Sequence, residues 1–111
     1  MTTREYSKKE RAELRRLASD VYEWELGQEL QALDESFREW RNGKLLSSEL
    51  SKEIHEFHQH AARQLWSMYQ SLREEDIVAR GLAMKAISDA ALSPGLRDKI
   101  TRLVRHFEGA R

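Results

Sequence analysis

The sequence predicts an all-α protein, an up-and-down bundle of four helices with a long N-terminal helix. The 111 residues include one proline and five glycines, and the strong helix formers alanine, leucine, glutamate and arginine are abundant. Apolar residues recur at steps of three and four, as they do on one face of an α-helix. Short turns separate the periodic segments, and short connections favour antiparallel neighbours.

The first predicted helix begins at Ser7 and ends at an Asn-Gly pair, residues 42–43. Ser7 and Glu10 have the spacing of a capping box, in which a hydroxyl and a carboxylate satisfy free amides at a helix start. Its apolar stripe comprises Leu14, Ala18, Tyr22, Leu26, Leu30, Leu33, Phe37 and Trp40. At 1.5 Å per residue this helix would be about 52 Å long and would outreach the others. We therefore expect a break between Ser19 and Gly27, which gives five helices, or an overhang that packs on a second copy.

Three shorter helices follow. A serine at 47 or 48 caps the second helix. The seam of that helix consists of Leu50, Ile54, Phe57, Ala61, Leu65, Met68 and Leu72. A capping box at Ser71–Glu74 starts the third helix, over residues 74–92, which has apolar residues on almost all sides and is expected to be buried. The pair at 93–94, Ser-Pro, opens the last helix, which Gly109 can end. Its stripe is Leu96, Ile100, Leu103 and Phe107.

Composition excludes several classes of protein. The chain is expected to form one domain over residues 1–111, with residues 1–7 as a disordered tail. Nineteen basic and nineteen acidic residues give no net charge, so a nucleic-acid partner is disfavoured. The absence of cysteine, of a signal peptide and of an apolar run of about 18–20 residues predicts a cytoplasmic protein without a membrane partner.

Charge is balanced overall but not locally. Residues 21–60 carry four basic and nine acidic side chains, residues 1–20 carry six and four, and residues 61–111 carry nine and six. The basic ends can therefore pair with the acidic middle, in the same chain or in a second subunit. The alternative is a set of ordinary solvated faces with pairs such as Asp34 and Arg38.

Three of the four histidines fall within six residues, at His55, His58 and His60. At about 100° per residue they point in three directions, and their spacing matches neither the His-Glu-x-x-His nor the Glu-x-x-His metal motif. His55 and His58 could share a metal with Glu29 or Glu35. The plainer interpretation is a half-buried, hydrogen-bonded His58 and a solvated His60, so we predict no metal and no other cofactor.

The second helix carries aromatic residues on a face outside its seam. Amphipathic aromatic side chains are enriched in protein interfaces. This face either covers a neighbouring helix or packs beside the overhang of the first helix in a homodimer. The residues predicted to make the interaction are Leu14, Leu17, Val21, His55, Trp66 and Tyr69.

No catalytic motif is recognisable, because the chain lacks a Gly-x-Ser-x-Gly elbow, a cysteine nucleophile and a glycine-rich phosphate loop. We therefore predict that the protein is not an enzyme. The last two helices have the outline of a helix-turn-helix, which leaves open a DNA-binding regulator. The cations that would contact DNA are Arg97, Lys99, Arg102 and Arg105.

The segment LSSELSKEIHEFHQHAARQLW, residues 46–66, resembles a stretch found in small uncharacterised bacterial helical proteins. The resemblance implies a bacterial source and carries no activity. The predicted function is a self-associating protein–protein interaction or regulatory module that forms a homodimer, with another protein as a further possible partner. The two alternatives are a metal-binding helical bundle that uses His55 and His58 and the DNA-binding regulator.

Overall fold

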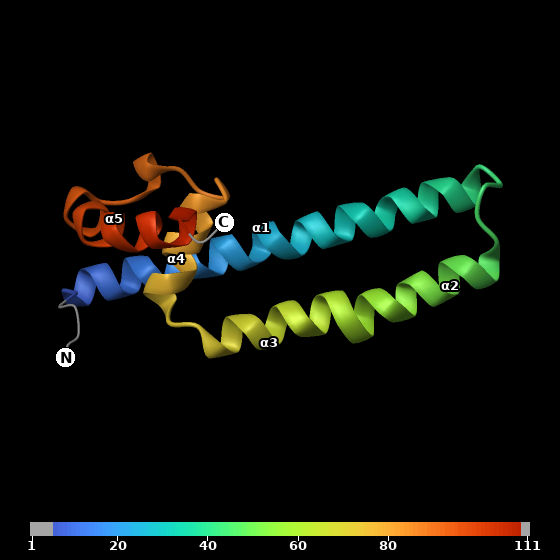
Figure 1. Ribbon diagram of the computed structural model, residues 1–111, viewed down its shortest axis with the longest axis horizontal. Helices are drawn as coiled ribbons and strands as arrows, with labels where there is room; N and C mark the ends of the chain where they lie inside the picture. Colours follow the sequence, from blue (N-terminus) through green and yellow to red (C-terminus); the bar gives the residue numbers. More distant parts are fainter. Residues whose placement is uncertain (1–5, 110–111) are drawn as a thin grey trace. The chain divides into compact units, whose positions relative to one another are not determined.

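A computed structural model describes the fold of residues 6–109 and the side chains of residues 6–105. It confirms the all-α class with four helical runs and a long first helix, and the described residues contain no strand. The elements are α1 (Lys8–Arg41), α2 (Ser47–Glu56), the π-helix η1 (Phe57–Ala62), α3 (Arg63–Ser71), α4 (Glu74–Ala83), the 3₁₀-helix η2 (Asp89–Ala91) and α5 (Pro94–Gly109). Together α2, η1 and α3 form the second predicted helix (Figure 1).

The helices divide into two compact units. The terminal unit combines residues 1–23 with residues 72–111, and the hairpin unit is residues 24–71. The single helix α1 contributes to both units, so the break expected between Ser19 and Gly27 does not occur. A lone glycine inside a helix costs about 1 kcal/mol, which is too little to end a helix that is packed on both sides of it. A single cooperative domain stays a prediction.

The terminal unit contains most of the buried apolar side chains. Most of them come from the start of α1, from α4 and from α5, and Val21, Val78 and Ile100 are fully buried. Five of the ten residues of α4 are buried, a larger fraction than in the other helices, as its composition predicts. A Cβ atom added at Gly81 would lie 2.4 Å from Cγ2 of Val21. The glycine therefore allows α4 to approach α1 closely.

The start of α1 has the predicted capping box. The Ser7 amide donates to Glu10 Oε1 at 2.9 Å, and the Glu10 amide donates to Ser7 Oγ at 3.0 Å. Lys99 donates to the same Glu10 oxygen at 2.7 Å and lies 5.7 Å from the ring centroid of Tyr6. The hydrogen bond from Lys99 is the main reason that the pKa of Glu10 is lowered. Because Tyr6 is buried and Ser7 caps α1, neither belongs to a disordered tail; residues 1–5 lie outside the described residues.

A carboxylate of α1 binds the start of α5. The amide and the hydroxyl of Ser93 donate to Glu13 Oε2 and Oε1 at 2.7 and 2.8 Å. Pro94 is the first helical residue, as predicted. A carboxylate at the N-terminus of a helix accepts hydrogen bonds from the free amides there and is attracted by the positive end of the helix dipole. This contact therefore links the two sequence segments of the terminal unit.

The left-handed stop predicted after α1 is present at Gly43, whose φ is 76°. The same kind of stop ends α4, where it was not predicted. Lys85 has a φ of 65°, and the amides of Lys85 and Ala86 donate to the carbonyls of Leu82 and Gly81, which is a Schellman motif. The third predicted helix, over residues 74–92, was therefore too long.

Two predicted caps are wrong. α4 begins after Arg73 without a side-chain cap, and the hydroxyl of Ser71 donates to the carbonyl of Met68 at 2.8 Å. The second helix begins at Ser47, preceded by Leu46, whose amide donates to Glu49 at 2.8 Å. A serine before a helical pattern marks its start only to within a few residues.

Candidate interaction surface

The hairpin unit has two helical arms. Figure 1 shows the second half of α1 antiparallel to the run from α2 to α3. Hydrogen bonds join the arms at both ends and between them. Trp40 donates to Ser47 Oγ at 2.9 Å, the Ser36 hydroxyl donates to the carboxylate of Glu53, and the Tyr69 hydroxyl donates to Glu25 Oε1 at 2.6 Å. The contact between the arms is therefore partly polar.

The hairpin buries few of its apolar side chains. Its buried hydrophobic residues are Leu50, Leu65 and Tyr69. The large hydrophobic residues that are exposed in the described chain all belong to this unit. They are Trp24 (37% exposed), Leu30 (48%), Trp40 (40%), Leu46 (67%), Ile54 (40%) and Trp66 (55%). A concentration of exposed apolar side chains is typical of a protein interaction surface.

A π-helix interrupts the second arm at Phe57–Ala62. A π turn contains about one residue more than an α turn, so the face of the helix beyond it rotates backward by about one residue, or ~100°. This rotation explains why Tyr69 is buried and bonded to Glu25, although uninterrupted α-helical winding places Tyr69 outside the seam. The sequence indicates no π-helix, because its steps of three and four continue through residues 57–62.

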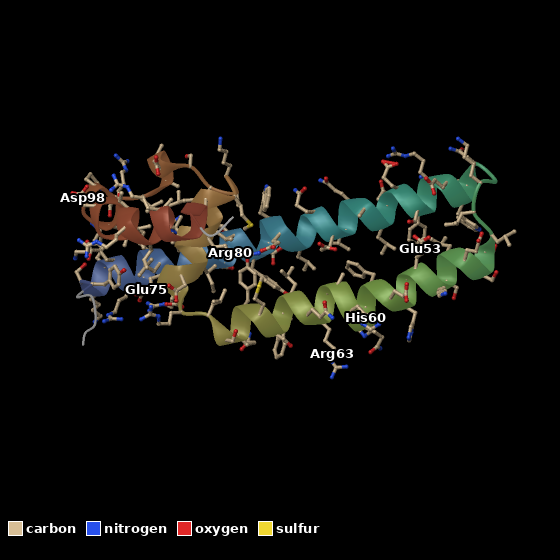
Figure 2. All side chains as sticks on the ribbon, viewed as in Figure 1. Glu53, His60, Arg63, Glu75, Arg80 and Asp98 are labelled. Atoms are coloured by element: carbon tan, nitrogen blue, oxygen red, sulfur yellow. The ribbon has the colours of Figure 1, made fainter. Side chains whose placement is uncertain are left out.

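One side of the hairpin has a groove that is lined by both acidic and apolar side chains. It has a volume of about 510 Å³ and is lined by Glu29, Ala32, Leu33, Ser36, Glu53, Glu56, Phe57, His60 and Ala61. Figure 2 shows Glu53 on the side of α2 that faces α1, where it accepts the hydrogen bond of Ser36. Three of the lining residues are glutamates and none is a lysine or an arginine, so this side of the hairpin is acidic.

The structure separates the residues predicted to form the interaction. Leu14, Leu17 and Val21 are 3%, 1% and 0% exposed, because the terminal unit covers them with its own side chains. They form no exposed overhang, which corrects that expectation. Tyr69 is also buried. His55 and Trp66 are exposed, but the π-helix lies between them, so they do not share the predicted aromatic face.

The histidine cluster has little contact with the core. His55, His58 and His60 are all exposed, so the half-buried, hydrogen-bonded state expected for His58 was wrong. His60 lines the groove between Glu53 and Glu56 of α2 and Glu29 of α1. Within residues 6–105, no group of three or more histidine and acidic side chains is placed to hold a metal ion. Neither Glu29 nor Glu35 therefore completes a metal site with His55 and His58.

Two of the cations proposed to contact DNA have roles inside the terminal unit. Arg97 donates to the carbonyls of Asp89 and Leu92 at 3.1 and 3.4 Å, and Lys99 pairs with Glu10. Arg102 and Arg105 are exposed. Of the four cations proposed to contact DNA, only Arg102 and Arg105 are therefore left for that role.

Part of the acidic excess of residues 21–60 is paired with a basic side chain on the same helix. Arg38 forms exposed pairs with Asp34 at 3.5 Å and Glu35 at 2.8 Å on one helix, as the solvated-face alternative predicts. Exposed pairs of this kind contribute little stability. None of the described helices is both long and apolar enough to cross a bilayer.

Comparison with protein families, with characterised proteins and with solved structures gives no match for this chain. The resemblance of residues 46–66 to bacterial helical proteins stays a prediction.

Proposed function

We propose that this protein is a self-associating interaction module whose hairpin unit packs on the hairpin unit of a second copy. The supporting observation is the distribution of apolar side chains. The terminal unit encloses its apolar residues, whereas residues 24–71 leave three tryptophans, two leucines and an isoleucine exposed. Within one hairpin each helical arm has a single neighbour, which cannot cover all its apolar sides. Two hairpins together provide the four helices of a bundle.

The energetics require a broad contact. Covering a half-exposed leucine or tryptophan side chain contributes about 1 kcal/mol, while association costs about 4 kcal/mol or more in lost translational and rotational freedom. Several exposed residues must therefore be covered together. Their spread along both arms, from Leu30 on α1 to Trp66 on α3, allows this.

Light scattering coupled to size-exclusion chromatography, over a wide range of protein concentration, tests the proposal. We expect twice the mass of the chain at high concentration. A double variant, Leu30→Gln with Trp66→Gln, should stay at the mass of one chain while its far-ultraviolet circular dichroism remains helical. Gln64→Ala, a change at an exposed polar residue of α3, should leave the dimer unchanged. A wild-type chain that has the mass of one copy at every concentration would refute the proposal.

A further inference from the structure

We infer that the second copy covers one defined face of the hairpin, the face of Leu30, Ile54 and Trp66, with the same face of its own hairpin. The inference rests on the proposed self-association and adds to it the face, the partner surface and the symmetry. We call this surface the apolar face, and the opposite surface the groove face.

The rotational positions on α1 separate the two faces. At about 100° per residue, Leu30 lies about 160° from Ala32 and about 100° from Glu29. Ala32 and Glu29 line the groove, as does Leu33, which lies about 60° from Leu30, whereas Leu30 does not line it. Phe37 lies about 20° from Leu30 and is half-buried, so it extends the apolar face along α1.

The positions on α2 give the same division. Ile54 lies about 100° from Glu53 and about 160° from Glu56, both of which line the groove. Because α2 is antiparallel to α1, its rotation has the opposite sense when both helices are viewed along one direction. Ile54 and Leu30 therefore lie on the same side of the hairpin, opposite the groove face.

The π-helix brings α3 into line with this face. Trp66 is about 60° from buried Tyr69, in the same rotational sense in which Ile54 is about 40° from buried Leu50. On an uninterrupted α-helix Trp66 would be about 160° from Leu50 and would point away from the other arm. The extra residue of the π turn removes about 100° of this difference, so Trp66 joins Ile54 on the apolar face.

Charge favours pairing through this face and disfavours pairing through the other. Two copies related by a two-fold axis present the same patch to each other. Joining two groove faces would bring together the carboxylates of Glu29, Glu53 and Glu56, and like charges that face each other at an interface oppose association. The apolar face has both signs at its rim, because Asp34 borders it on α1 and Arg63 on α3, where Figure 2 shows Arg63 directed away from the helix. A two-fold axis can therefore place opposite charges across the rim.

Cysteine labelling tests the face directly, because the chain has no cysteine of its own and each introduced thiol is unique. The variants form two matched pairs. On α1, Leu30→Cys is on the apolar face and Ala32→Cys is in the groove. On the second arm, Ala62→Cys is about 40° from Trp66 on the apolar face, and Ser67→Cys is about 100° from Trp66 on the outer side.

Maleimide labelling rates are measured at low and high protein concentration, and light scattering reports the mass of each variant. Where about nine-tenths of the chain is dimeric, mass action predicts about tenfold slower labelling at Leu30→Cys and Ala62→Cys, and no change at Ala32→Cys and Ser67→Cys. A Leu30→Cys chain that is monomeric while Ala32→Cys is dimeric would support the same face.

The results separate this inference from the proposed function. A dimer in which Ala32→Cys is protected and Leu30→Cys labels freely would overturn the face assignment and leave self-association intact. Equal labelling of both members of each pair in a confirmed dimer would place the contact outside the hairpin, and it would also overturn the face assignment. A wild-type chain that never dimerises removes both.

Discussion

Replacement of Gly81 by alanine gives a sharp test of the packing between α4 and α1. The added methyl carbon would lie 2.4, 3.0 and 3.2 Å from Cγ2, Cγ1 and Cβ of Val21. Carbon atoms without a bond between them prefer separations of about 3.5–4.0 Å. Val21 is fully buried and cannot turn into solvent, so α4 or Val21 must move.

The expected magnitude combines two opposing effects. Alanine has a helix propensity about 1 kcal/mol better than that of glycine, whereas overpacking of a closed core costs about 1–3 kcal/mol. An overlap of more than 1 Å with the side chain of Val21 belongs at the upper end of that range, so we expect Gly81→Ala to lower the free energy of unfolding by about 1–2 kcal/mol. Gly27→Ala on α1 is the matched control, because nothing lies within 4 Å of its added Cβ atom. It should gain about 0.5–1 kcal/mol.

Urea unfolding followed by two signals measures these changes. All three tryptophans lie in residues 24–66, so tryptophan fluorescence reports the hairpin unit, while far-ultraviolet circular dichroism reports both units. A single cooperative domain predicts one transition that coincides in the two signals. Adding Val21→Ala to Gly81→Ala should recover part of the loss, with a favourable coupling free energy in the double-mutant cycle. If Gly81→Ala stabilises the protein as much as Gly27→Ala does, the close approach of α4 to α1 is wrong.

Three further changes have defined outcomes. The lowered pKa of Glu10, which the hydrogen bond from Lys99 mainly causes, predicts stability that is present above the ordinary carboxyl pKa of 4.5 and is lost as the pH falls below it. Glu10→Gln should remove this part of the acid dependence in urea unfolding, and an unchanged pH profile would contradict it. Lys85→Gly should raise the unfolding free energy by about 0.5 kcal/mol, because glycine adopts the left-handed conformation without steric cost, and a fall in thermal midpoint would count against it. Tyr69→Phe should cost about 1–2 kcal/mol through the lost hydrogen bond to Glu25, visible in tryptophan fluorescence during unfolding; no loss would show that the bond does not form.

The sequence predicts the helices well, because their signals are local. The capping box of Ser7 and Glu10, the left-handed stop at Gly43 and the first position of Pro94 depend on residues within one turn of each other, and all three are present. The caps predicted for α2 and α4 failed for the same reason, since a serine near a helix start is satisfied equally well by a neighbour such as Trp40 or Met68.

The candidate surface was predictable only in part. The sequence places Trp66 outside the seam but leaves open whether a neighbouring helix covers it, and the face that it shares depends on the π-helix at residues 57–62. Regular spacing of apolar residues continues through that segment, so no local pattern distinguishes a π turn from an α turn. The sequence also contains no sign that Leu14 and Leu17 are buried, because they belong to one compact unit with residues 72–111, more than fifty positions away in the sequence.

The discontinuous make-up of the terminal unit has a consequence for biosynthesis. The hairpin arms are contiguous in sequence, so they can pair as soon as residues 24–71 have left the ribosome. Glu13 of α1 accepts hydrogen bonds from Ser93 and Glu10 accepts one from Lys99 of α5, so we expect the core of the terminal unit to close only after α5 has been translated. If the chain self-associates as proposed, we expect hairpins on neighbouring ribosomes of one messenger to meet while their exposed apolar side chains are available and before the terminal unit has folded.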